Sequence, residues 1–312
     1  MKKRGQHYVW KNYLKSWTTN GKLFCLRDNK IFDTNPYNIA QQRDFYRLKE
    51  LTEKEIRFIK GLIDRLPSEV KSLHTGQLDL FNSIFTIKEC YESLDIKCAE
   101  VEKQLDIRIN NFEEDLHSSI EGIGAPYINK ILESDLSFWD NESSRGEFSY
   151  YLAIQYFRTK RMRNRVLASS NQFNSNAPTE FSDYLFDMER AFGVLSHILA
   201  VNVGDNLACM QLELLRNDTN LPFITTDQPA INLIDDGNGI DIPPTGFELY
   251  YPVSPNTAII IFNNRIPIFS NDICEDDVTE LNDMMEKASL EQIYANKQTV
   301  LERYQKSNME TR

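Results

Sequence analysis

A histidine close to the start of the chain is the first candidate for acid–base chemistry. His7 lies in the segment Gln6-His7-Tyr8-Val9-Trp10, just before a predicted helix. An imidazole has an ordinary pKa of about 6.5, so it can give or take a proton near neutral pH. The same ring could instead pack against the helix or cap it. Gln6, its neighbour, is a candidate ligand-binding residue.

A carboxylate two thirds of the way along the chain is the second candidate. Asp227 follows the run Phe223-Ile224-Thr225-Thr226 and stands two residues before Pro229, which predicts a strand that ends in a turn. A carboxylate held at the end of a strand can orient a histidine, accept a proton or bind a metal ion. The alternative is an Asx-turn that only ends the strand. Thr225 is a candidate ligand-binding residue beside it.

A basic segment in the middle of the chain is the candidate for contact with phosphate. Between Arg158 and Arg165, five of eight residues are cationic, although the chain has a net charge of −11. Arginine presents paired donors that match phosphate oxygens. The alternative is a solvated helix face that balances the acidic remainder of the chain. The candidate phosphate- or ligand-binding residues of this segment are Gln155, Arg158, Lys160 and Arg161.

Together these residues predict a metal-assisted phosphodiester hydrolase, such as a nuclease. His7 would act as acid or base, Asp227 would bind Mg²⁺ or Mn²⁺ or orient His7, and Arg158 would hold phosphate. Nucleic acid or a nucleotide would bind through the basic helix. The alternative is a non-catalytic sensor or binding module, in which the same residues hold a small anionic ligand or a protein partner. A pocket shared by His7, Asp227 and Arg158 would favour the enzyme, and burial in separate turns would favour binding or architecture.

Several familiar signatures are absent from the sequence. It contains no GxxxxGK[ST] loop, no GxGxxG after a predicted strand, no HExxH and no CxxC pair, which argues against P-loop ATP hydrolysis and a zinc knuckle. The other histidines stand singly in predicted helices and are expected to be structural: His74, His117 and His197. Five scattered cysteines are typical of a reducing compartment, so we predict a cytoplasmic location.

Composition and charge exclude several further classes. The 312 residues are 41% hydrophobic and 26% charged, which is typical of a globular chain rather than a disordered or collagenous one. The net charge of −11 disfavours non-specific binding of nucleic acid, so such a partner must meet a local patch. The longest apolar run, 258–262, is far shorter than the roughly 18 residues of a membrane helix. No membrane partner or signal peptide is expected.

The spacing of apolar residues predicts a mostly helical chain. Thr52 and Glu55 form a capping box before a helix that ends at Pro67. Apolar residues recur at intervals of three and four in several other stretches, which is the period of one helix face. Helices are therefore predicted within 9–17, 78–132, 145–169, 182–201 and 275–303.

β-structure is predicted in two places. Two short strands between residues 22 and 32 form a hairpin near the N-terminus. Residues 207–270 form a sheet-rich region of short apolar runs, separated by turn signals such as 236–239. The predicted fold class is therefore α+β, predominantly helical, with a short N-terminal hairpin and a small C-terminal antiparallel or mixed sheet. We expect one compact domain over 1–312, with a candidate helical insertion at 50–140.

Taken in order, these segments resemble a bacterial family of unknown function. Its members open with a His-Tyr-Val-Pro phrase and carry a Phe-Ile-Thr-Ser-Asp-x-Pro phrase; this chain has Trp10 where the family has proline and Thr226 where it has serine. The resemblance extends from about residue 6 to residue 297, and no phrase matches within 50–140. It implies that His7, Arg158 and Asp227 converge on one site. Members occur among antiphage loci, so the resemblance also implies an effector of bacterial defence.

Overall fold

The computed structural model describes residues 1–176, 185–235, 246–263, 267–269 and 273–305. Helices account for most of its regular structure, so the α+β, predominantly helical fold class is confirmed. The helices of the described residues are α1 (Lys11–Leu14), α2 (Glu53–Ile63), α3 (Ser68–Glu92), α4 (Ala99–Leu132), α5 (Glu142–Phe157), α6 (Lys160–Asn176), α7 (Met188–Ala208), α8 (Glu275–Ala288) and α9 (Gln298–Glu302).

The strands form a small pair and two four-stranded sheets within the described residues, and every pairing is antiparallel. One sheet has the order β3-β2-β10-β6 and the other the order β5-β9-β8-β7, while β1 pairs with β4 alone. The strands are β1 (Gly5–His7), β2 (Leu23–Arg27), β3 (Lys30–Thr34), β4 (Gln41–Arg43), β5 (Gln211–Arg216), β6 (Thr225–Thr226), β7 (Ile231–Asn232), β8 (Leu249–Ser254), β9 (Thr257–Phe262) and β10 (Ile293–Ala295).

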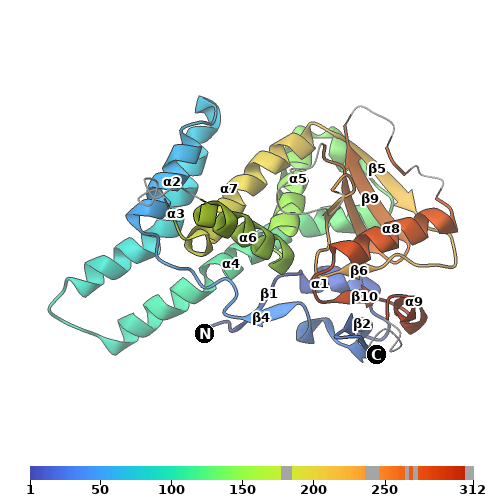
Figure 1. The fold of residues 1–312 in the computed structure, drawn as a ribbon, viewed down its shortest axis with the longest axis horizontal. Helices are drawn as coiled ribbons and strands as arrows, with labels where there is room; N and C mark the ends of the chain where they lie inside the picture. Colours follow the sequence, from blue (N-terminus) through green and yellow to red (C-terminus); the bar gives the residue numbers. More distant parts are fainter. Residues whose placement is uncertain (177–184, 236–245, 264–266, 270–272, 306–312) are drawn as a thin grey trace.

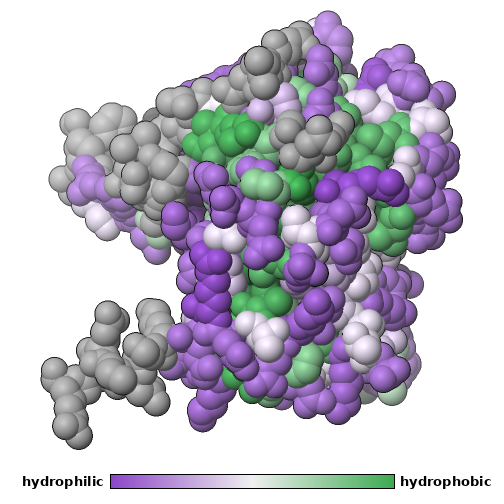
Figure 2. Space-filling view, turned by 90° about the vertical axis from the view of Figure 1, so that its right-hand side faces the viewer, coloured by the Kyte–Doolittle hydropathy of each residue, from purple (hydrophilic) through white to green (hydrophobic). Residues whose placement is uncertain are grey.

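The elements form a helical end and a sheet end (Figure 1). Helices α2 and α3 lie at one end of the molecule, the sheets with α8 lie at the other, and α5, α6 and α7 lie between them. Figure 2 looks onto the sheet end, where hydrophilic residues cover most of the surface and hydrophobic ones gather in patches. No helix in the described part of the chain combines the length and apolar character needed to cross a membrane.

Helix α5 is the centre of the molecule. Phe148 and all residues from Tyr151 to Phe157 are buried, so the C-terminal half of the helix is enclosed on every side. A helix that is apolar around its whole circumference is stable only when other elements cover it. Helices α4 and α7 pack against it, and the Tyr151 hydroxyl lies 2.9 Å from that of Tyr251 on β8. The central helix therefore joins the helical end to the C-terminal sheet.

The predicted hairpin is present as β2 and β3, but it does not join the C-terminal sheet β5-β9-β8-β7. It pairs instead with β10, which also pairs with β6, so Tyr294 lies between Cys25 and Thr225. The helix predicted over 275–303 is consequently wrong over 289–297, where the chain leaves α8 and forms β10 before it becomes helical again in α9. A strand of three residues is too short for its pattern of apolar residues to distinguish it from a helix, so the sequence did not indicate β10.

The predicted helix over 145–169 is two helices. The chain breaks between α5 and α6 at Arg158 and Thr159, and the Thr159 hydroxyl accepts a hydrogen bond from the Met162 amide at 3.3 Å. This is the contact made by a helix N-cap, and it lets α6 begin in a new direction. The helix predicted to end at Ser169 continues as far as Asn176, and the turn predicted at 236–239 lies outside the described residues.

Candidate ligand-binding site

His7 is the last residue of β1 and precedes α1 by four residues. It pairs with Gln41 across the ladder, and its carbonyl oxygen accepts a hydrogen bond of 2.6 Å from Arg158. Burial lowers the pKa of the ring to about 4, and the positive charges of Lys11 and Arg158 add to the effect. In the described part of the chain, the buried Nε2 atom has no hydrogen-bond partner. The imidazole is therefore neutral at pH 7 and a weak base.

Arg158 is completely occupied by internal contacts. Its Nε donates to the Tyr46 hydroxyl at 3.1 Å, one terminal nitrogen donates to Glu121 at 2.5 Å, and the other binds the His7 carbonyl. The residue is 2% exposed. The structure thus brings Arg158 and His7 together, but through the backbone of His7. The guanidinium positions β1 against α5, and each of its nitrogens already has an acceptor.

Asp227 follows β6 and is also fully bound. Its carboxylate accepts backbone hydrogen bonds from Leu290 at 2.8 Å, Glu291 at 2.7 Å and Gln292 at 3.2 Å. Burial raises its pKa to about 6, against the effect of these three donors. None of its hydrogen bonds within the described residues joins it to His7. The structure gives this carboxylate a clear role, which is to hold the segment that leads into β10.

The predicted ligand-binding residues Gln6, Thr225 and Gln155 are buried in the core. The Gln6 side chain donates to the Asn110 carbonyl at 2.7 Å and accepts from the Tyr46 amide at 2.6 Å. The Thr225 hydroxyl lies 2.7 Å from that of Tyr13. The Gln155 amide nitrogen has no partner among the described residues. Gln6 and Thr225 therefore connect elements of the fold, and the three residues do not line a cavity together.

Two predicted site residues line cavities: His7 lines one of about 700 Å³, and Arg161 lines a smaller one. This cavity, about 260 Å³ in volume, lies between the first turns of α6, the segment 228–235 and the end of α8. Its polar lining includes Arg161, Arg165 and Lys287 from two helices, together with Asp235. Arg165 forms an ion pair with Asp235. Its apolar lining consists of Tyr156, Met162, Ile231, Leu233, Ile234, Met284 and Ala288.

Cations outnumber carboxylates in the lining of this cavity. Burial lowers the pKa of Arg161 and the positive charge of Arg165 lowers it further, while the negative charge of Asp235 acts in the opposite direction. Arg161 donates one hydrogen bond, of 2.8 Å, to the Lys287 carbonyl, and it forms no ion pair with any residue that the structure describes. Two guanidinium groups held near each other repel, so a negative charge between them lowers their energy. Lys160, the preceding residue, is instead paired with Glu291.

A model of one protein family matches residues 5–299, which is nearly the whole chain. The chain belongs to the family described as protein of unknown function, DUF4238. The prediction of membership in a family without an assigned function is therefore confirmed. No curated protein and no solved structure matches the chain.

Two features of this DUF4238 member have no counterpart in the predicted site. Lys287 reaches the cavity of Arg161 from a helix that begins more than a hundred residues later, and no local pattern marks it. Glu113, His117 and His197 also lie together, with one ligand atom from each residue within 4.8 Å of the others. The spacing of Glu113 and His117 by four residues on one helix was the available signal for this group.

The Glu113 group carries little charge in this structure. Burial raises the pKa of the Glu113 carboxyl to about 8 and lowers the pKa of His197 to about 3. Burial also lowers the pKa of His117, and the positive charge of Arg158 acts in the same direction. Although Glu113 Oε1 and His117 Nε2 are only 3.5 Å apart, both groups are therefore neutral at pH 7 and do not form an ion pair.

Proposed function

We propose that this chain is a binding module for a small ligand that combines an anionic group with a flat apolar part, such as a nucleotide. The observation that carries the proposal is Arg161, a half-buried guanidinium on the wall of a cavity with one hydrogen bond to a backbone carbonyl. A cation in such a place has donors left for a ligand, and its partial burial strengthens a hydrogen bond to an anion.

The rest of the cavity suits the apolar part of such a ligand. Its volume of about 260 Å³ lies just below the usual range for small-molecule sites, about 300 to 1,000 Å³. The lining combines cations with apolar and aromatic groups, with Tyr156 and Met284 among the latter. Ligand pockets commonly combine an apolar lining with a few polar groups that fix orientation. A nucleoside monophosphate has both kinds of surface.

The phosphodiesterase hypothesis stays a prediction with less support. A metal-assisted hydrolase needs a carboxylate free to hold the ion and a cation free to meet phosphate. The Asp227 carboxylate already accepts three backbone hydrogen bonds, and Arg158 is paired with Glu121. Binding without chemistry needs neither group. The predicted role in defence against phage likewise stays a prediction.

The test is calorimetric titration of the full chain with the four nucleoside monophosphates, inorganic phosphate and adenosine. We expect at least one monophosphate to bind more tightly than adenosine or phosphate. Arg161→Gln should weaken that binding about 10- to 100-fold, since a hydrogen bond to a charged group contributes about 1.5 to 3 kcal/mol. The matched control is Lys160→Gln, which removes one positive charge from the preceding residue, whose side chain does not line the cavity.

Two results would remove the proposal. One is a failure of all four monophosphates to bind; the other is an equal loss of affinity in the Arg161 and Lys160 variants, which would indicate an effect of net charge alone. Cleavage of single-stranded DNA or RNA in the presence of Mg²⁺ or Mn²⁺, abolished by His7→Ala, would favour the nuclease hypothesis instead.

A further inference from the structure

The second feature with the chemistry of a site lies at the helical end, away from the cavity of Arg161. Glu113 and His117 are four residues apart on α4, so they project from the same face of that helix. His197 and Gly193 have the same spacing on α7, which faces them. A Cβ atom on Gly193 would come within 2.8 Å of the Glu113 carboxylate. The glycine therefore allows the close approach that brings His197 to Glu113 and His117.

Three of the four ring nitrogen atoms of this group lack hydrogen-bond partners among the described residues, although all three side chains are buried. Neither ring nitrogen of His117 has a partner among the described residues, and the same holds for Nε2 of His197. Both histidines are 1% exposed. Burying such groups without a partner costs free energy, so their presence in a packed core calls for an explanation. A bound cation satisfies several of them at once.

The distances within the group suit a metal ion. Glu113 Oε1 and His117 Nε2 are 3.5 Å apart, close to the separation of about 3.3 Å between two ligands of a tetrahedral zinc ion. The three ligand atoms lie within 4.8 Å of one another, close enough for one ion to contact all three. The Tyr150 hydroxyl lies 3.3 Å from Nδ1 of His197, which leaves Nε2 to face the group. Such a contact to the far nitrogen is the usual support of a metal-binding histidine.

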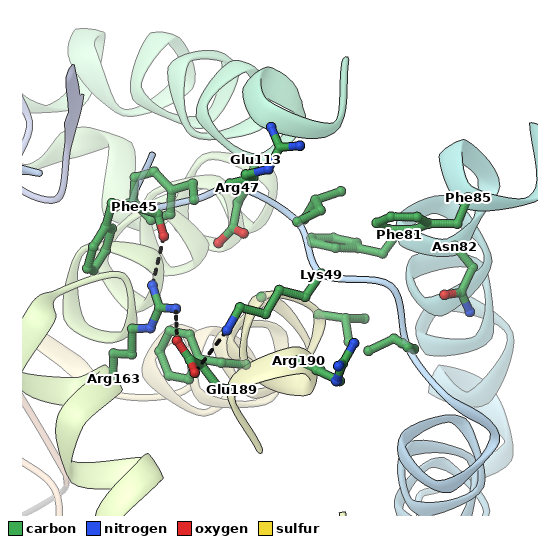
Figure 3. Close-up of a pocket in the computed structure, with 16 residues that line it drawn as sticks. Phe45, Arg47, Lys49, Phe81, Asn82, Phe85, Glu113, Arg163, Glu189 and Arg190 are labelled. Atoms are coloured by element: carbon green, nitrogen blue, oxygen red, sulfur yellow. Dashed lines mark hydrogen bonds and ion pairs between the residues drawn. The ribbon is translucent and has the colours of Figure 1, made fainter. Parts of the chain in front are cut away.

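A small pocket borders this group at Glu113 (Figure 3). It lies between the segment 45–51, α3 and α7, and the Glu113 side chain points into it. Its volume of about 30 Å³ is enough for a water molecule. Arg163 lines the pocket, donates to the Phe45 carbonyl and pairs with Glu189. Three protein ligands and a place for water make up the coordination of a zinc ion with an open position.

We propose that Glu113, His117 and His197 bind a divalent transition-metal ion, with Zn²⁺ the ion that two imidazoles and one carboxylate suit best. Imidazole ligands favour zinc and its neighbours over Mg²⁺, which prefers oxygen ligands. The positive charges of Arg158 and Arg163 oppose a cation here, and each is offset by its own carboxylate, Glu121 and Glu189. The site is independent of the ligand-binding cavity on which the proposed function depends.

The test uses the full chain, stripped with a chelator and titrated with Co²⁺, whose visible absorption reports coordination by protein ligands. We expect about one equivalent to bind, with displacement by Zn²⁺ and no displacement by Mg²⁺. His117→Gln and His197→Gln should each weaken Co²⁺ binding at least about 100-fold, because even the loss of an outer partner costs 10- to 100-fold. Circular dichroism checks that each variant is folded, and Glu113→Gln, which keeps the side-chain volume, serves if both histidine variants unfold.

The matched control is His74→Gln, a substitution of another buried histidine. His74 lies on α3 and contacts Gln77 at 2.9 Å, outside the group. This variant should bind Co²⁺ like the unaltered chain. The proposal is overturned if the unaltered chain binds no Co²⁺, or if binding survives the substitution of both His117 and His197. Either result would identify the group as a neutral buried cluster.

Discussion

Replacement of Asp227 by asparagine tests which of two opposing effects controls a buried carboxylate. Burial disfavours its ionised form, while three backbone donors favour that form. The balance raises the pKa from 3.8 to about 6. The folded chain therefore holds this proton more tightly than the unfolded chain does. Between these two pH values the folded state binds more protons, so the stability that this group contributes falls as the pH rises.

The size of the effect follows from the two pKa values. The rise from 3.8 to about 6 corresponds to about 3 kcal/mol, at about 1.4 kcal/mol for each tenfold change in proton affinity. About 2 kcal/mol of this falls between pH 4.5 and pH 7.5. An asparagine side chain at this position cannot ionise, and its amide nitrogen would face backbone donors, which adds a cost of about 1 to 3 kcal/mol that does not depend on pH.

The assay is urea denaturation of the unaltered chain and of Asp227→Asn at several pH values, followed by tryptophan fluorescence. Trp17 is a suitable reporter because it is fully buried and donates to the Phe223 carbonyl, close to β6. We expect the stability of the unaltered chain relative to the variant to fall by about 2 kcal/mol from pH 4.5 to pH 7.5. Asp33→Asn is the control of opposite sign, since Lys22 lowers the pKa of exposed Asp33 and its ionised form is the stabilising one. A relative stability that is constant or rises with pH for Asp227→Asn would refute the reasoning, because the three donors would then outweigh burial.

Two further predictions concern helix packing and helix capping. Gly124→Ala should destabilise the chain by about 1 to 3 kcal/mol, because a Cβ atom there would overlap the Tyr151 ring. Gly122→Ala meets no atom within 4 Å and should stabilise α4 by up to about 1 kcal/mol. Thermal denaturation of the two variants measures this contrast, and equal effects on stability would contradict it. Thr52→Ala removes a capping box and should cost about 1 kcal/mol in urea denaturation, while an unchanged midpoint would show that the cap contributes nothing.

Local interactions made part of the fold predictable. The capping box of Thr52 and Glu55 is present at the start of α2, because both of its hydrogen bonds join residues three positions apart. The hairpin of β2 and β3 is present for a similar reason, since its strands are neighbours in sequence. The helical structure predicted within 78–132 is present as α3 and α4, although α3 begins earlier, at Ser68. In each case the pattern that predicts the element lies within the element itself.

The candidate site was predictable only in part. The basic segment does supply Arg161 to a cavity, but Arg158 in the same segment turns inward and binds Glu121. Both residues are arginines in the same basic segment, so charge and spacing in the sequence cannot show which one is buried. The difference arises because Arg158 stands at the break after the buried helix α5, where its side chain enters the core. Burial is a property of the assembled chain.

The amino-acid order by itself determined the class of the fold, most of its helices and the residue types available for chemistry, because these depend on interactions within one or two turns. Tertiary structure alone decided that Tyr294 pairs with Cys25, that Lys287 meets Arg161, and that His197 reaches Glu113. Contacts of such long range depend on how all apolar faces are buried together, and no single segment carries the energy that selects them.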